Sequence, residues 1–186
     1  MRKQINFLKI ALSDGQIGAM ARSSKYVIGS VLRSIGKRPL HKVIEYGPGD
    51  GVLTKEILKR MPKDGELVAV ETNPKFYKIL SHLRDPRLKV IKGKAQNVSK
   101  VLESRNKATV DLVVSSIPFS ILKRWERERV TSDAYNMLAA KGRFIVFHQY
   151  SPLMLNILNK YFGAKSVNTQ FEVRNILPCF IMTAQK

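Results

Sequence analysis

Two hydrophobic patterns, one typical of strands and one typical of helices, alternate along most of the chain. From residue 41 onward, short runs rich in β-branched and apolar residues are separated by stretches whose apolar residues recur three or four positions apart. The expected strands are His41–Tyr46, Leu67–Glu71, Leu88–Lys92, Asp111–Ile117 and Arg143–His148. The expected helices are 52–61, 74–83, 96–104, 121–140 and 152–162. This alternation predicts an α/β fold, in which right-handed crossovers join a parallel sheet covered by helices on both faces.

The end of the chain breaks this rhythm. Residues 165–173 and 176–184 are two β-rich runs joined by a short Arg174-Asn175 turn, which predicts a terminal antiparallel hairpin. The expected sheet therefore has seven strands and is mostly parallel. Near Pro39 we place the one domain boundary, between a helical leader over residues 1–38 and a main domain over residues 39–186.

Composition narrows the class of protein. The chain has 186 residues, 44% of them hydrophobic, which is enough for one domain with a full core. No uncharged apolar stretch approaches the ~20 residues that a spanning helix needs, so any membrane contact is expected to be peripheral. Cys179 is the single cysteine, which excludes an internal disulfide and a cysteine-rich zinc site. We expect a metal-free, cytoplasmic protein that acts as a monomer and keeps its amino terminus, because Lys9 and Asp14 interrupt the signal-like segment.

The chain is strongly basic. It carries 33 Lys and Arg against 14 Asp and Glu, a formal net charge of +19. Asp14 is the only acidic residue among residues 1–38, which hold eight basic ones. The electric field of these charges attracts nucleic acid, anionic lipid or polyphosphate alike. The alternative is a well-solvated basic protein without a polyanionic partner.

A glycine-rich bend follows the first expected strand. Glu45 precedes three alternating glycines, Gly47, Gly49 and Gly51, and an expected helix begins directly after them. Glycine permits positive φ and close approach of a ligand to the backbone, although a tight strand-to-helix turn alone also uses it. Glu71 ends the second expected strand 20 residues after Gly51, where a carboxylate can accept both hydroxyls of a ribose. Two carboxylates at such a bend suit a cationic ligand.

These residues resemble the first motif of Rossmann-like S-adenosylmethionine-dependent methyltransferases, an acidic residue followed by G-x-G-x-G. The resemblance implies a Rossmann-like methyltransferase fold over residues 41–186, with S-adenosylmethionine as cofactor. It also implies that Glu45 faces the methionine amine or a water beside it, that the glycines pass under the methionine and ribose, and that Glu71 holds the ribose. Family members often carry an aspartate for adenine where this chain has Lys94. Adenine recognition is then expected from the Ala95 amide or the Gln96 side chain, and the donor site is completed by Thr72 and Ser115.

Ser116-Ile117-Pro118-Phe119 follows the fourth expected strand. Proline keeps the preceding residue extended, so local carbonyls can accept hydrogen bonds from an amine. The segment resembles the substrate motif of amine methyltransferases, including the ribosomal RNA adenine dimethyltransferases, whose first residue is usually asparagine. Ser116 in that place weakens the nucleic-acid interpretation, because a hydroxyl does not reproduce an amide. An ordinary strand exit with Phe119 in the core is the alternative.

Three further segments resemble bacterial phospholipid N-methyltransferases: residues 18–25, 147–152 and 174–178. Exposed amides and basic side chains at the helix start after residue 22 make a candidate seat for the substrate phosphate, with the residues Arg22, Ser23, Ser24, Lys25 and Arg174. Serines at a helix start also serve as simple caps without a ligand.

The leader can form a short basic amphipathic helix. Ile5, Leu8 and Leu12 share one helical face, which suits either an anionic bilayer surface or the domain itself. Ile121 and Trp125, among basic residues, form a second candidate contact with the membrane, or part of a solvated charged face.

The leading hypothesis is therefore an S-adenosylmethionine-dependent N-methyltransferase that acts on the amino head group of a phospholipid, phosphatidylethanolamine towards phosphatidylcholine, at a membrane surface. Tyr46, His148 and Tyr150 are candidates to polarise the amine or to take its proton, and Ser116 and Phe119 complete the catalytic set. His148 is the one that ordinarily titrates near neutrality, but a packed histidine is the alternative. Two rivals remain: methylation of ribosomal RNA adenine, and a non-catalytic lipid or nucleic-acid binder with the same fold.

Overall fold

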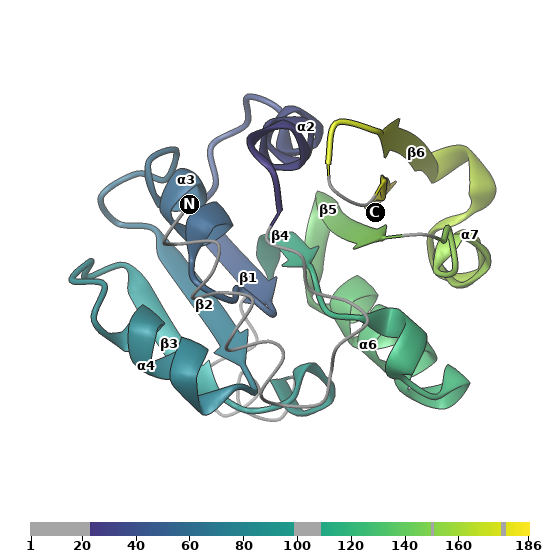
Figure 1. The fold of residues 1–186 in the computed structure, drawn as a ribbon. Coiled ribbons are helices and arrows are strands. Elements are labelled where there is room, and N and C mark those ends of the chain that lie inside the picture. Colours follow the sequence, from purple (N-terminus) through teal and green to yellow (C-terminus); the bar gives the residue numbers. More distant parts are fainter. Residues whose placement is uncertain (1–22, 99–108, 150, 176–177) are drawn as a thin grey trace.

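The computed structural model describes residues 23–98, 109–149, 151–175 and 178–186. Within these ranges, seven strands form one sheet in the order β3-β2-β1-β4-β5-β7-β6 (Figure 1). The strands are β1 (Lys42–Tyr46), β2 (Glu66–Glu71), β3 (Leu88–Lys92), β4 (Val110–Ser115), β5 (Leu138–Gln149), β6 (Val167–Glu172) and β7 (Cys179–Gln185). Strands β1 to β5 pair in parallel, whereas β7 is antiparallel to both β5 and β6. The expected mostly parallel sheet with a terminal antiparallel hairpin is confirmed.

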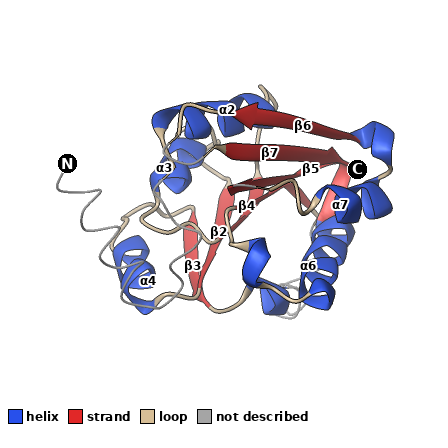
Figure 2. Cartoon of the chain, turned by 45° about the vertical axis from the view of Figure 1, so that its right-hand side comes forward, coloured by secondary structure: helices blue, strands red, loops and turns tan. Residues whose placement is uncertain are grey.

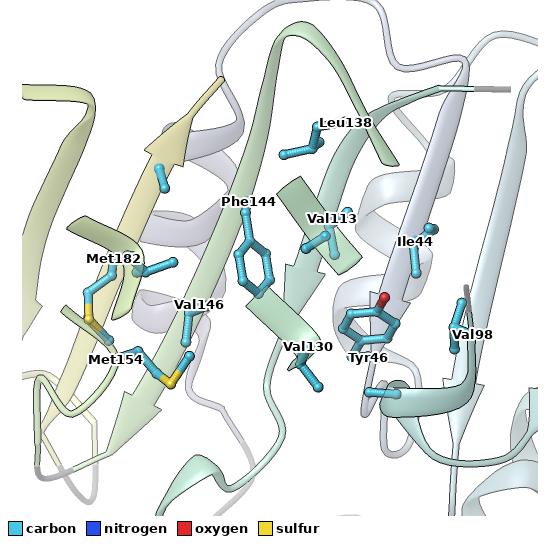
Figure 3. Close-up of a cluster of buried hydrophobic side chains, with 14 of the residues drawn as sticks. Ile44, Tyr46, Val98, Val113, Val130, Leu138, Phe144, Val146, Met154 and Met182 are labelled. Carbon is cyan, nitrogen blue, oxygen red and sulfur yellow. The ribbon is translucent and has the colours of Figure 1, made fainter. Parts of the chain in front are cut away.

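Helices cover both faces of the sheet (Figure 2). They are α2 (Lys25–Ile35), α3 (Val52–Leu58), α4 (Pro74–Ser81), α6 (Arg124–Met137) and α7 (Leu155–Phe162), with the short 3-10 helices η1 (Ala95–Asn97), η2 (Phe119–Ile121) and η3 (Ala164–Ser166). Val31 of α2 and Ile57 of α3 belong to one buried cluster. Val130 of α6 and Leu158 of α7 belong to the other, part of which is drawn in Figure 3.

The direction of the strands brings the functional segments to one edge. The carboxyl ends of β1, β2, β4 and β5 meet there because these strands are parallel. Strand β6 ends at the same edge, since β5 and β6 are both antiparallel to β7. Helix α2 begins there as well, because Ser24 contacts Arg174, which follows β6. We call this the carboxyl edge.

The expected helix over residues 121–140 is wrong at its end. The helix stops at Met137, and residues 138–140 begin β5 instead. Leu138 pairs with Val110 of β4, and the Lys141 backbone amide donates to the Lys186 carbonyl. These partners are distant in sequence, so the local pattern of apolar residues does not reveal them. Of the helix expected over 96–104, the described residues form η1 and the first positions after it.

The described part of the expected leader packs on the domain. Helix α2 buries Val27, Val31 and Ile35 in the same cluster as Leu112 of β4. Ser24 caps its first turn by accepting from the Val27 amide. The apolar face expected over residues 5–12 lies outside the described residues. Among the described helices, none is both long enough and apolar enough to span a bilayer.

Candidate functional site

The glycine bend between β1 and α3 is built from left-handed backbone. Gly47, Gly49 and Gly51 have φ of 70°, 59° and 77°, a region that other residues enter only with strain. A Cβ on Gly47 would lie 2.9 Å from the Ile117 side chain, so this glycine lets the bend meet the segment after β4. A Cβ on Gly51 would instead meet Leu80 of α4 at 2.9 Å. Gly51 therefore lets the start of α3 lie close to the Leu80 side chain.

Glu71 lies at the end of β2, facing this bend. It is buried, and its two carboxylate oxygens accept from the Gly49 amide at 3.0 Å and from the Asn73 amide at 2.8 Å. Burial raises its pKa, and these hydrogen bonds act in the opposite direction. Thr72 also donates to Glu71, through its amide and through its exposed hydroxyl. A ribose hydroxyl would take the place of this Thr72 hydroxyl on the carboxylate.

Glu45 is buried on the other side of the bend. One of its oxygens accepts from the Thr54 hydroxyl in α3 at 2.7 Å. Burial raises the pKa of Glu45 to about 7, the Thr54 hydrogen bond lowers it, and the charge of Glu71 adds to the increase. Two carboxyl groups are thus held close together around one loop, an arrangement that a cationic ligand stabilises.

The expected adenine residues follow β3, beside Glu71. The Gly93 amide donates to the Glu71 carbonyl, which holds this loop against β2. Ala95 and Gln96 are buried in η1, while Lys94 and Thr72, another residue expected at the donor site, are exposed.

The acceptor segment after β4 contacts the glycine bend directly. The Ser116 hydroxyl donates to the Gly47 carbonyl, and the Ser116 amide donates to the Tyr46 carbonyl at 3.0 Å. Ser115 is fully buried, and its hydroxyl has no hydrogen-bond partner within the described residues. Phe119 is fully buried in the core, as the alternative interpretation of this segment expected.

The structure does not place Tyr46 at the site. Its ring is fully buried on the α6 side of the sheet, where Figure 3 shows its hydroxyl between Ile44 and Val113. Burial raises its pKa further above the ordinary value, so the phenol keeps its proton. The expectation that Tyr46 meets the acceptor amine is wrong for this structure. His148 is buried near the end of β5, two positions after Val146, which pairs with Ser115 at the end of β4. Tyr150 lies outside the described residues.

The expected phosphate seat comes together from two ends of the chain. Ser24 donates through its hydroxyl to the Arg174 carbonyl at 2.9 Å and through its amide to the Asn175 side chain at 3.0 Å. The Arg174 guanidinium lies 4.7 Å from the centre of the Tyr26 ring, and the Lys25 ammonium lies 5.2 Å from it. Ser23 is half-buried beside Ser24, and Arg22 lies outside the described residues.

Arg174 is held by a carboxylate that the sequence analysis missed. Two of its nitrogens donate to the two oxygens of Glu172, at 2.8 and 2.9 Å, and the Ser30 hydroxyl donates to Glu172 at 3.0 Å. These bonds lower the pKa of Glu172 to about 2. The guanidinium is thereby oriented while its remaining N–H groups stay exposed to solvent. The spacing Glu172-Val173-Arg174 was the available signal.

Two other residues of the site were also missed. Thr54, the partner of Glu45, stands three positions after Gly51, and Glu126, the partner of Gln96, stands three positions after Lys123, the N-cap of α6. No group of three His, Cys, Asp or Glu side chains suited to a metal is present in the part of the chain that the structure describes.

Comparison with known families decides the class. Residues 22–124, more than half of the chain, match the family described as ribosomal RNA adenine dimethylase. The chain belongs to this family. It is an S-adenosylmethionine-dependent methyltransferase, and the matched residues include the glycine bend, Glu71 and the acceptor segment.

Curated relatives of this dimethylase-family chain are named for different acceptors. An ornithine lipid N-methyltransferase from Singulisphaera acidiphila is 25% identical over 164 residues, which cover 87% of this chain and 84% of that protein. A ribosomal RNA small subunit methyltransferase A from Chlorobium limicola is 29% identical over 106 residues, which cover 57% of this chain and 38% of that protein. Similarity to the lipid enzyme thus extends over most of both chains, and similarity to the RNA enzyme does not.

Solved structures agree on the fold. The N-methyltransferase NodS from Bradyrhizobium japonicum WM9, solved with S-adenosylhomocysteine, superposes with a TM-score of 0.68 at 11% identity and covers 88% of this chain and 89% of that one. The Rossmann-like methyltransferase fold expected from the sequence is confirmed.

The residues present fit the methyl donor. Gly47 leaves room for backbone contact where a side chain would strike Ile117, and Glu71 offers acceptors for a ribose. Glu45 and Glu71 add carboxyl groups suited to a ligand that carries a sulfonium and an ammonium. The sequence-based choice of these residues for the donor remains a prediction.

Proposed function

We propose that the protein methylates the primary amine of a membrane lipid head group, with phosphatidylethanolamine as the leading acceptor. The observation that carries the proposal is the cluster of Ser24, Lys25 and Arg174 at the carboxyl edge, where α2 and β6 flank the expected reaction site. Its cationic groups suit the phosphate of an ethanolamine phospholipid, and equally the carboxylate of an ornithine lipid. The extent of the similarity to an ornithine lipid N-methyltransferase supports an amino lipid as acceptor.

The chain's own residues would position the amine. Bound S-adenosylmethionine supplies a methyl group on a sulfonium leaving group, so alignment is the main task of the protein. The Ser116 hydroxyl donates to the Gly47 carbonyl, and its oxygen can therefore accept an N–H of the amine. The amine must be uncharged when it attacks, and we propose His148, near the carboxyl end of β5, as the group that receives its proton. Turnover by His148→Ala at saturating lipid should fall, and wild-type turnover would exclude this role.

Methylation of adenine in ribosomal RNA is the second candidate. It is favoured by the family and by the net charge of +19. Against it stands Ser116, at the place where RNA adenine enzymes usually carry asparagine.

The deciding experiment offers both acceptors to the full-length protein. Purified protein and donor labelled in the methyl group are incubated with vesicles of phosphatidylethanolamine in an anionic lipid, with vesicles of ornithine lipid, and with ribosomal RNA. We expect label in the lipid amine. Lys25→Gln should lower the rate at subsaturating lipid severalfold, whereas Lys59→Gln, a matched change on the surface of α3, should not. Label in RNA alone would overturn the proposal.

A further inference from the structure

The donor's adenine should lie over the loop that follows β3. The glycine bend follows β1, Glu71 ends the neighbouring β2, and β3 is next in the sheet, while the acceptor segment follows β4 on the opposite side of β1. A ribose held at Glu71 with its methyl group directed to β4 must extend its base towards β3. Residues 93–97 form that side of the site.

Gln96 in this loop is tied to a helix that begins on the acceptor side. Its amide nitrogen donates to one Glu126 oxygen at 3.2 Å, and the other Glu126 oxygen accepts from the Lys123 amide at 2.9 Å. Gln96 is only 9% exposed, so its side chain has little freedom to turn towards water. Glu126 thereby joins η1 to the first turn of α6.

This contact determines which end of the Gln96 amide, the nitrogen or the oxygen, is turned towards a ligand. A carboxylate only accepts, so Gln96 must turn its nitrogen to Glu126, which directs its carbonyl oxygen away from Glu126. A carbonyl accepts from the exocyclic amine of adenine and repels the oxo group that replaces this amine in hypoxanthine. Lys94 is exposed and has no acceptor with which to read that amine.

We propose that Glu126 is a positioning residue for base recognition: it fixes the Gln96 amide so that the donor site accepts a 6-amino purine and rejects a 6-oxo purine. The inference concerns the donor and is independent of whether lipid or RNA receives the methyl group.

The test measures binding rather than turnover. Dissociation constants of S-adenosylhomocysteine and S-inosylhomocysteine are determined by calorimetry for the wild type and for Glu126→Gln. The wild type should bind the adenosyl compound at least tenfold more tightly. A glutamine at 126 that accepts from the Lys123 amide presents its own nitrogen to Gln96 and reverses the Gln96 amide, so the ratio of the two constants should fall at least fivefold.

Two further variants complete the test. Glu128→Gln changes a carboxylate of the same helix that pairs with Arg124 and Lys160, and it should leave the ratio unchanged. Gln96→Met keeps the length of the side chain without its amide, and should weaken binding of the adenosyl compound and bring the ratio close to one. If Glu126→Gln folds and leaves the ratio of the two dissociation constants unchanged, the proposal is overturned. If Glu126→Gln does not fold, an unchanged ratio in Gln96→Met overturns it. A wild type that binds neither compound would overturn it together with the donor site.

Discussion

At the scale of single residues, the folded protein buries a carboxyl group, Glu45, whose charged form is unfavourable. Glu45 is enclosed on all sides, shares its loop with Glu71 and has the Thr54 hydroxyl as its hydrogen-bond donor. Its folded-state pKa of about 7 exceeds the ordinary value of 4.5. The folded protein therefore holds this proton more tightly than the unfolded chain does. The contribution of Glu45 to stability is complete below pH 4.5 and is lost as the pH rises through 7.

Glu45→Gln should accordingly stabilise the protein in a pH-dependent manner. The glutamine oxygen can still accept from Thr54 but carries no charge. The gain in the free energy of unfolding should be small at pH 5 and reach about 3 kcal/mol at pH 8. Urea denaturation at the two pH values measures it, and Glu66→Gln, which alters an exposed pair with Lys89, should change little at either. An equal effect of Glu45→Gln at both pH values would contradict the assignment.

Gly47 and Gly51 allow a matched pair of substitutions. Both have positive φ, so alanine at either position should cost about 1–2 kcal/mol in backbone strain. The Gly47→Ala methyl group also strikes Ile117 and approaches Ser116, whereas that of Gly51→Ala strikes Leu80. Turnover per folded molecule should therefore fall more than tenfold for Gly47→Ala and much less for Gly51→Ala. Denaturation and initial rates on the same preparations separate the two effects, and equal losses of turnover would contradict this division of roles.

At the scale of elements, the strands were predictable and their limits were not. Buried parallel strands are nearly continuous apolar runs, which is why residues 67–70 and 112–114 stand out. Strand β3 is less buried and was recognised by its β-branched residues between lysines. The start of β5 depends on pairing with Val110 and on the backbone of Lys186, and no local pattern encodes these partners. The same distinction holds in the site. Spacing identified Glu45 and Glu71 as paired acids, but the burial of Tyr46 depends on helix α6, which packs over it from elsewhere in the chain.

A buried carboxylate, Glu172, links helix α2 to the end of β6. Glu172 accepts from Ser30 of α2 and from Arg174, and its pKa of about 2 lies below the ordinary 4.5. A depressed pKa means that its stabilising contribution is present above pH 4.5 and disappears as the pH falls through 2. Glu172→Gln should therefore lower the melting temperature at pH 6, with the difference from the wild type shrinking as the pH falls from 4.5 towards 2.

Thermal scans across this pH range test the attachment. Glu56→Gln is the control, because Glu56 pairs with Lys59 on the exposed face of α3. Its melting temperature should follow that of the wild type throughout. A Glu172→Gln variant as stable as the wild type at pH 6 would show that α2 does not depend on this carboxylate.

At the scale of the whole molecule, basic and apolar side chains project on both sides of the carboxyl edge. Ile121 ends η2 and is 56% exposed, and Trp125 lies in the first turn of α6 and is 59% exposed; Lys123 and Arg124 lie between them. Across the edge, Val173 is 61% exposed, next to Arg174. Exposed apolar residues among cations suit an anionic bilayer surface, into which the apolar groups insert while the charges meet lipid phosphates. Such contact would direct the expected reaction site towards the lipid that we propose as its substrate.

The single tryptophan makes this orientation measurable. Trp125 is the only tryptophan of the chain, so its fluorescence reports on this rim without labelling. Anionic vesicles should shift its emission to shorter wavelength, and 1 M salt should largely reverse the shift, because charges then attract over only about 3 Å. Ile121→Asp should weaken vesicle binding severalfold, whereas Ile79→Asp, at an exposed position on α4, should not. Vesicle binding that leaves the emission unchanged, or that both variants weaken equally, would mean that another face of the molecule meets the membrane.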